Sequence, residues 1–139
     1  MIALDTNVII HLLVRSQAEH PRAKAWFGQN DEPLATTSTN VGEVLRLLSH
    51  PRVFLAPLTL AKAVDLLKSF VEDREISVLD EAEAWWSDLG ELARELPTVA
   101  GNEVFDARIA LCLRHHGVRH ICTLDDDFLK YPFLKQVKI

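Results

Sequence analysis

Short apolar runs alternate with longer segments of helical periodicity along this chain. The first run occupies residues 1–4 and ends abruptly on Asp5, after which a second and longer apolar segment begins at Val8. Short apolar runs that are bounded by polar residues are typical of buried strands. We therefore predict strands at residues 1–4, 34–37, 75–79 and 120–124, with an additional edge strand at residues 136–139.

The segments between these runs have the apolar spacing of helices. In the longest of them, Leu60, Val64 and Leu67 recur at intervals of three and four residues and so share one helical face. Proline suits the first turn of a helix, and glycine suits the position just after one. We predict a helix from Asp5 to about Val14, and a second from Pro21 to a loop at 29–33. The third begins at a cap formed by Ser38, Thr39 or Asn40 and ends at Pro51, and the fourth spans residues 60–71. The fifth begins at a capping box of Asp80 and Glu83 and ends at Pro97, and the sixth spans residues 103–116 and is ended by Gly117.

Strands that alternate with helices indicate an α/β fold in which helices flank a mostly parallel sheet, a three-layer sandwich. The helix predicted at residues 103–116 is apolar nearly all round, and a helix of this kind is expected to be buried. A chain of 139 residues is long enough to bury a sizeable core, and we expect residues 1–139 to form a single domain.

Composition excludes several classes of protein. A hydrophobic content of 48% excludes disorder, and no apolar run approaches the roughly 18 residues that a membrane span needs. Cys112 and Cys122 lie in apolar contexts without CxxC spacing, which favours reduced thiols and a cytoplasmic protein. The net charge of −5 argues against strong nonspecific affinity for nucleic acid, unless bound divalent ions offset the acids. No glycine-rich phosphate loop is present.

Acidic residues stand at the ends of several predicted strands and at the starts of the helices that follow. Asp5 follows the first strand, Glu43 lies one turn into the helix after the second, Asp106 lies in the first turn of the apolar helix, and Asp125 and Asp127 follow the fourth strand. In a parallel sheet these positions share one edge. Two carboxylates about 4 Å apart repel by roughly 4 kcal/mol at an effective dielectric near 20, so either some pKa values rise or a divalent cation neutralises the cluster. All-oxygen ligands favour Mg²⁺ or Mn²⁺.

Most of these acids also have a purely structural interpretation. Asp5 can cap the following helix, Glu43 can pair with Arg46, and the acidic run 125–127 can be a solvated turn. The same two interpretations exist for the small polar residues Thr6, Asn7 and Thr123. Their side chains can position a water or a phosphate, or can form hydrogen bonds to the backbone of turns.

Asp106 is the acid that a structural role explains least well. Its neighbours on the helix are apolar, and an unpaired buried carboxylate is unfavourable. Arg108 cannot offset it, because residues two apart do not face each other on a helix. The histidines show no metal-ligand spacing, and the pair Trp85 and Trp86 indicates a core or interface role rather than a platform for nucleobases.

Four pieces of the sequence together resemble the PIN domain, in particular the VapC toxins of bacterial and archaeal toxin–antitoxin pairs. The resemblance runs over essentially the whole chain. Each piece alone is weak, but all four in this order and spacing are fairly specific. The pieces are Leu-Asp-Thr-Asn at 4–7, Asn-Val-Gly-Glu-Val at 40–44, Phe-Asp-Ala at 105–107 and Thr-Leu-Asp-Asp-Asp-Phe at 123–128.

The resemblance implies a metal-dependent endoribonuclease that is inhibited by a small antitoxin, a VapB-like protein that inserts a segment near the active site. It implies that Asp5 and Asp106 bind Mg²⁺ directly and that Glu43 acts through water. Three consecutive acids leave the register at 125–127 open, and Asp126 should point away if the segment is extended. Matched by motif, the acidic quartet is Asp5, Glu43, Asp106 and Asp125, the additional acid is Asp127, and the small hydroxyl residue is Thr6.

Our leading hypothesis is therefore an RNA-cleaving toxin in which Mg²⁺ activates a water. One alternative is a non-catalytic PIN module that binds RNA or protein as a scaffold. Another is a phosphoacceptor regulatory domain, although no suitable Lys stands near Thr123. The helical regions 58–70 and 82–96 offer apolar surface that favours a homodimer, and an antitoxin could use the same surface.

Overall fold

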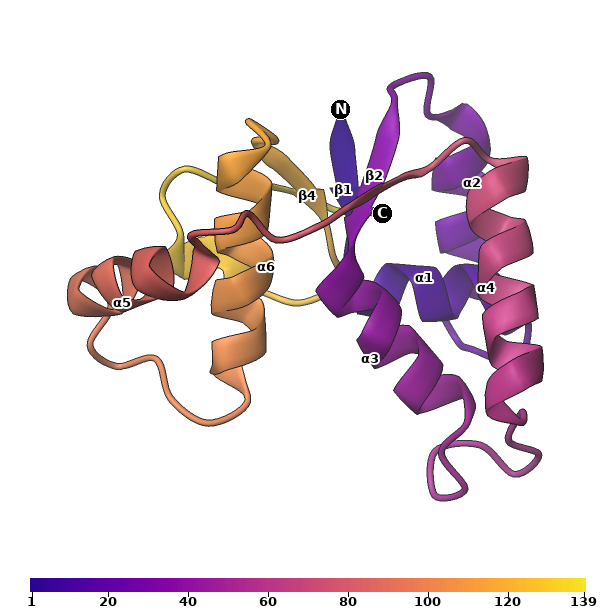
Figure 1. The fold of residues 1–139 in the computed structure, drawn as a ribbon. Helices are drawn as coiled ribbons and strands as arrows, with labels where there is room; N and C mark the ends of the chain where they lie inside the picture. The colour runs from indigo at the N-terminus through magenta and orange to yellow at the C-terminus, as the bar shows by residue number, and fades with distance from the viewer.

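Five parallel strands form one sheet, and helices cover both of its faces (Figure 1). The computed structural model describes all of residues 1–139. In chain order the elements are β1 (Ile2–Leu4), α1 (Thr6–Leu13), α2 (His20–Gln29), β2 (Leu34–Thr37), α3 (Ser38–Leu48), α4 (Leu60–Asp73), β3 (Ser77–Leu79), α5 (Trp85–Glu95), α6 (Glu103–His115), β4 (His120–Cys122), the 3₁₀ helix η1 (Asp127–Lys130) and β5 (Lys135–Val137).

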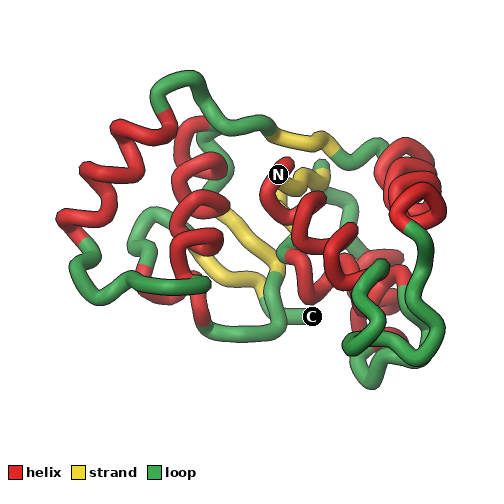
Figure 2. The backbone as a smooth tube through the Cα atoms, turned by 60° about the horizontal axis from the view of Figure 1, so that its bottom comes forward, coloured by secondary structure: helices red, strands yellow, loops and turns green.

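Strand β1 lies at the centre of the sheet because it is apolar on both faces. Side chains alternate along a strand, so Ile2 and Leu4 point into one core while Ala3 points into the other. The first core contains residues of α1, α3 and α4, and the second contains residues of α5, α6 and η1. Figure 2 shows the strands between these two layers of helices.

The order of the strands creates a switch point beside β1. The sheet order is β3-β2-β1-β4-β5, so the chain moves outward from β1 to β3 and then returns to place β4 on the other side of β1. Because all neighbouring strands are parallel, their carboxyl ends meet at one edge. The crevice at such a switch point is where open α/β sheets bind ligands. Asp5 and Thr123 directly follow the two strands that flank it.

The structure confirms the main elements expected from the sequence. All five predicted strands are present, β5 is an edge strand, and the predicted α/β architecture is correct. Pro21 lies in the first turn of α2, and Gly117 follows α6 with a φ of 69°. Both cysteines are buried free thiols. No helix has both the length and the apolar character that crossing a bilayer would require.

Three local predictions are wrong. Asp80 and Glu83 form no capping box, because α5 begins only at Trp85 and has no side-chain cap. The N-cap of helix α3 is Thr37 rather than Ser38, Thr39 or Asn40; its hydroxyl accepts a hydrogen bond from the Asn40 backbone N–H, and Asn40 completes a capping box because its side-chain oxygen accepts from the Thr37 backbone N–H at 3.4 Å. Helix α6 is not buried over its whole length, since two apolar side chains in its first turn are about 40% exposed, Val104 at 39% and Phe105 at 43%.

Candidate active site

Asp5 combines a structural role with that of a candidate ligand. Its Oδ1 accepts hydrogen bonds from the Thr6 backbone N–H at 2.7 Å and from the Asn40 side-chain amide at 3.3 Å, and its Oδ2 accepts one from the Thr123 hydroxyl at 2.7 Å. Asp5 therefore caps α1, as one of the two interpretations predicted. The cap does not explain why the carboxyl group is buried, with only 6% of the residue exposed.

The surroundings of Asp5 oppose its ionisation. Burial, together with the negative charges of Asp125 and Glu43, raises the pKa of Asp5 to about 7, although the hydrogen bonds from Thr123 and from the Thr6 backbone act in the opposite direction. No lysine, arginine or histidine forms a salt bridge with Asp5. A buried carboxylate near two others and without a cation is the arrangement expected where a positively charged ligand binds.

Glu43 is held toward Asp5 by Thr6 rather than by the predicted partner Arg46. The Thr6 hydroxyl donates to the Glu43 carboxylate at 2.5 Å and accepts from the Asn40 amide at 3.0 Å. Glu43 and Arg46 form no salt bridge, so the structural interpretation of Glu43 is wrong. Asn40 lies three residues before Glu43, which places both side chains on the same face of α3.

The acidic run after β4 divides its side chains between two directions. Asp125 Oδ2 accepts a hydrogen bond from the Asn7 amide at 2.8 Å, which directs Asp125 toward β1. Asp126 points away: its side chain is 75% exposed and pairs with Lys138 at 2.9 Å, although its backbone is not extended as the prediction assumed. Asp127 begins η1 and raises the pKa of Asp106 by its charge. Asp125 and Asp127 are therefore the two acids of the run that face the cluster.

Asp106 lies half-buried in the first turn of α6. Burial, together with the charges of Asp127, Glu43 and Asp125, raises its pKa to about 6. Arg108 does not offset it, as predicted, because its guanidinium donates two hydrogen bonds of 2.8 Å to the Glu81 carboxylate. Glu81 belongs to the segment where a capping box was expected, and this pairing holds that segment against α6.

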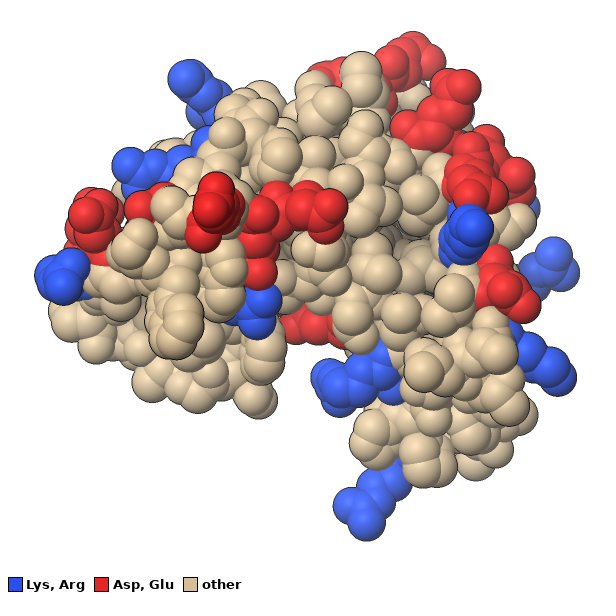
Figure 3. Space-filling view, in the orientation of Figure 1, with Lys and Arg blue, Asp and Glu red and all other residues tan.

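These acids surround one depression at the carboxyl edge of the sheet. Asp5, Glu43, Asp106 and Asp125 line the same pocket, so residues that are far apart in sequence do converge there. A larger groove of about 710 Å³ adjoins this pocket between α3 and α6, and Asp127 lines it together with Glu43 and Asp106. Figure 3 shows the groove as a hollow at the lower side of the molecule, with acidic atoms deep inside and basic side chains on both walls.

The donor set of the pocket suits a hard divalent cation. Every candidate ligand is a carboxylate oxygen, and none of the four pocket acids is neutralised by a salt bridge. No three acidic, histidine or cysteine side chains lie close enough to enclose one ion by themselves.

Asn40 is the site residue whose role the sequence did not reveal. It is 1% exposed and its amide donates to both Asp5 and Thr6, so it connects α3 to the start of α1. The sequence offered it as a helix cap and as the first residue of the motif at 40–44, without a role in the site. The available signal was its spacing of three residues from Glu43, which places it on the helical face that carries the acid.

Comparison with known proteins agrees with this geometry. The sequence profile described as "PIN domain" matches residues 2–134. Ribonuclease VapC24 of Mycobacterium tuberculosis is 31% identical over 131 residues, which cover 88% of this chain and 85% of the relative. The family match therefore includes every segment that contributes to the pocket, and the match to VapC24 spans most of both proteins.

Solved structures share the same fold. The crystal structure of Mycobacterium tuberculosis VapC20, a toxin that cleaves the sarcin-ricin loop, has a TM-score of 0.70 at 21% identity and covers 96% of this chain and 97% of that one. VapBC2 from Rickettsia felis, solved with a DNA fragment from its promoter, has a TM-score of 0.69 at 19% identity and covers 100% of this chain and 99% of that one.

Proposed function

Because the chain belongs to the PIN-domain family, we propose that it is a metal-dependent endoribonuclease that hydrolyses RNA phosphodiester bonds as the toxin of a toxin–antitoxin pair. The observation that carries the proposal is the buried Asp5 carboxylate. It lies at the switch point of the sheet beside Glu43, Asp106 and Asp125, with its pKa raised to about 7 and no salt-bridge partner. The match to a relative named as a ribonuclease supports the same reaction.

Each residue has a distinct part in the proposed site. Asp5 and Asp106 would hold Mg²⁺, or Mn²⁺, directly, and Glu43 and Asp125 would hold it through water. When bound, the ion would neutralise the carboxylates and lower the pKa of a water that attacks phosphorus. The hydrogen bonds that Asp5 accepts from Thr6, Asn40 and Thr123 fix the orientation of its carboxylate before any ligand arrives. Thr6 orients Glu43 in the same way.

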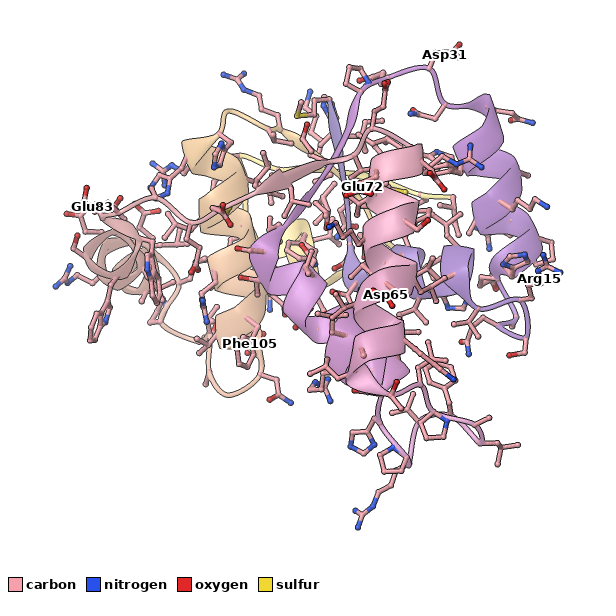
Figure 4. The ribbon with its side chains drawn as sticks, turned by 45° about the vertical axis from the view of Figure 1, so that its right-hand side comes forward. Arg15, Asp31, Asp65, Glu72, Glu83 and Phe105 are labelled. Atoms are coloured by element: carbon pink, nitrogen blue, oxygen red, sulfur yellow. The ribbon has the colours of Figure 1, made fainter.

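The proposal predicts that cleavage depends on the cation and on Asp106. We expect the purified protein to cut single-stranded RNA in Mg²⁺ and not in EDTA. The variant Asp106→Asn should cleave more than a hundredfold more slowly, because loss of a positioned charged group typically lowers rates by about 10²–10⁴. Cleavage of a fluorescent RNA measures this. Asp65→Asn, on an exposed face of α4 far from the pocket (Figure 4), should keep full activity. Equal cleavage by Asp106→Asn, or cleavage that survives EDTA, would refute the mechanism.

We also propose that a small VapB-like antitoxin inhibits the chain in the cytoplasm, where its cysteines would stay reduced. Expression of the chain alone should arrest bacterial growth, and co-expression of a small protein encoded next to it should relieve the arrest. Growth curves measure both effects, and expression of the Asp106→Asn variant should not arrest growth. Arrest that persists in the Asp106→Asn strain would show that toxicity does not come from cleavage.

A homodimer stays a prediction, supported by apolar residues that remain exposed on α4 and α5, among them Leu60 and Trp86.

A further inference from the structure

The groove between α3 and α6 has one apolar feature in an otherwise polar lining. Phe105 is the single hydrophobic residue among those that line it. It directly precedes Asp106 in the first turn of α6, and Figure 4 shows it at the end of that helix. A lone exposed aromatic ring beside the acidic pocket is therefore a candidate contact for a ligand that reaches the carboxylates.

Phe105 has no role in the core that would explain its position. The residue is 43% exposed and belongs to neither core cluster. The aromatic pairs of the fold are Phe27 with Phe70, Trp85 with Trp86, and Tyr131 with Phe128 and Phe133, so Phe105 has no aromatic partner. Its ring face is available for stacking.

Arg46 provides a free positive charge in the same lining. It lies one turn after Glu43 on α3 and lines both the acidic pocket and the groove. The other arginine of the groove, Arg108, is committed to Glu81 and to the ring of Trp85, whose centroid is 4.7 Å away. Arg46 forms no salt bridge, and a guanidinium is well suited to bind a phosphate through two hydrogen bonds.

A third group of the groove lacks a partner. The hydroxyl of Thr39, in the first turn of α3, is buried from water and makes no hydrogen bond within the protein. Thr39 precedes Arg46 by seven residues, or about two helical turns, so both lie on similar faces of α3.

We propose that the groove binds single-stranded RNA, with an unpaired base stacked on Phe105 and a neighbouring phosphate held by Arg46. The inference rests on the proposed function, because it places the RNA next to the acidic pocket. A base in a duplex is already stacked on both sides, whereas a splayed base can use an aromatic ring. Stacking tolerates every base, so the contact with Phe105 selects an unpaired base rather than a particular base.

Binding can be measured apart from cleavage. In the Asp106→Asn background with Mg²⁺ present, fluorescence anisotropy with a short labelled RNA reports the Kd. Phe105→Ala should weaken single-strand binding by about tenfold, and Phe105→Tyr should retain it, because stacking on an aromatic ring contributes roughly 1–3 kcal/mol per base. Val104→Ala is the matched control, since Val104 is 39% exposed in the same turn but does not line the groove.

The phosphate contact has its own measurement. Arg46→Ala should reduce the slope of log Kd against log salt concentration by about 0.7, the value for one phosphate contact on a single strand. Arg46→Lys should keep most of that slope. Arg94→Ala, on the exposed side of α5, should leave it unchanged.

The outcomes separate this inference from the proposed function. Single-strand binding that depends on Phe105 in a protein that cuts no RNA would support the groove and refute the nuclease. Cleavage with an unchanged KM in Phe105→Ala would support the nuclease and overturn the groove. The groove proposal would also be overturned if Val104→Ala weakened RNA binding as much as Phe105→Ala does. The same holds if a duplex of the same sequence depended equally on Phe105, or if no single-stranded RNA bound at all.

Discussion

The variant Asp5→Asn is expected to be more stable than the natural protein in the absence of metal and at the same time to lose more than a hundredfold in RNA cleavage. The natural carboxyl group is 6% exposed and has a pKa of about 7, against 3.8 in an exposed reference state. Each unit by which the pKa in the folded state exceeds the reference pKa corresponds to about 1.4 kcal/mol. Ionised Asp5 therefore destabilises the fold at pH 8 by up to about 4 kcal/mol. Asn has nearly the same shape and carries no charge.

The pH dependence of this difference has a defined sign. The folded state binds the Asp5 proton more tightly than the unfolded state, because its pKa is raised from 3.8 to about 7. The destabilisation is therefore absent below about pH 4, grows as the pH rises toward 7, and is complete above pH 7. Asp5→Asn should raise the free energy of unfolding by about 2–4 kcal/mol at pH 8 and by less at pH 5.

Urea unfolding in EDTA at the two pH values measures the effect. Asp65→Asn, an exposed carboxyl group on α4, should change stability by less than about 0.5 kcal/mol. Added Mg²⁺ should stabilise the natural protein in proportion to its binding and should stabilise Asp5→Asn far less. A variant that is less stable than the natural protein by the same amount at both pH values would show that Asp5 serves only as the cap of α1.

The position of the acids could be predicted because it follows from local patterns. An apolar run that ends on Asp5 indicates the tip of a buried strand, and alternation of strands with helices indicates a parallel sheet whose tips share an edge. Together these two inferences bring Asp5, Asp106 and Asp125 to one place without any knowledge of long-range contacts. The outward direction of Asp126 was predicted on the condition that the segment is extended; Asp126 does point outward, but its backbone has φ −112° and ψ 12° and is not extended.

The features that could not be predicted depend on partners distant in sequence. Asn40 reaches Asp5 across 35 positions; its spacing from Glu43 indicates the helical face it shares with that acid but does not indicate the contact with Asp5. Glu81 pairs with Arg108 across 27 positions, which ties the segment where a capping box was expected to α6. The exposure of Phe105 likewise depends on how far α6 extends beyond the sheet. Patterns of hydrophobicity indicate which face of a helix or strand is buried, but they do not indicate how far that element extends beyond its neighbours.

Phe128→Ala is expected to produce the largest loss of stability in the part of the chain that carries the acids. Phe128 is 1% exposed, lies in η1 directly after the acidic run, and packs against Tyr131 with ring centroids 6.0 Å apart. Removal of a buried phenylalanine ring leaves a cavity and typically lowers the free energy of unfolding by about 3–5 kcal/mol. The second core cluster, which includes α6 residues beneath Asp106, would lose one of its largest side chains.

Urea unfolding followed by tryptophan fluorescence measures this loss. Phe128→Leu should be milder, at about 1–2 kcal/mol, and provides a folded variant if the alanine protein does not fold. Leu129→Ala is the matched control, because Leu129 follows in the same turn but is 66% exposed and should change stability by less than about 0.5 kcal/mol. Since η1 positions Asp127 over the groove, Phe128→Leu should also reduce RNA cleavage more than Leu129→Ala does. Full stability and cleavage in Phe128→Leu and Phe128→Ala would show that the acidic run keeps its position without support from the core.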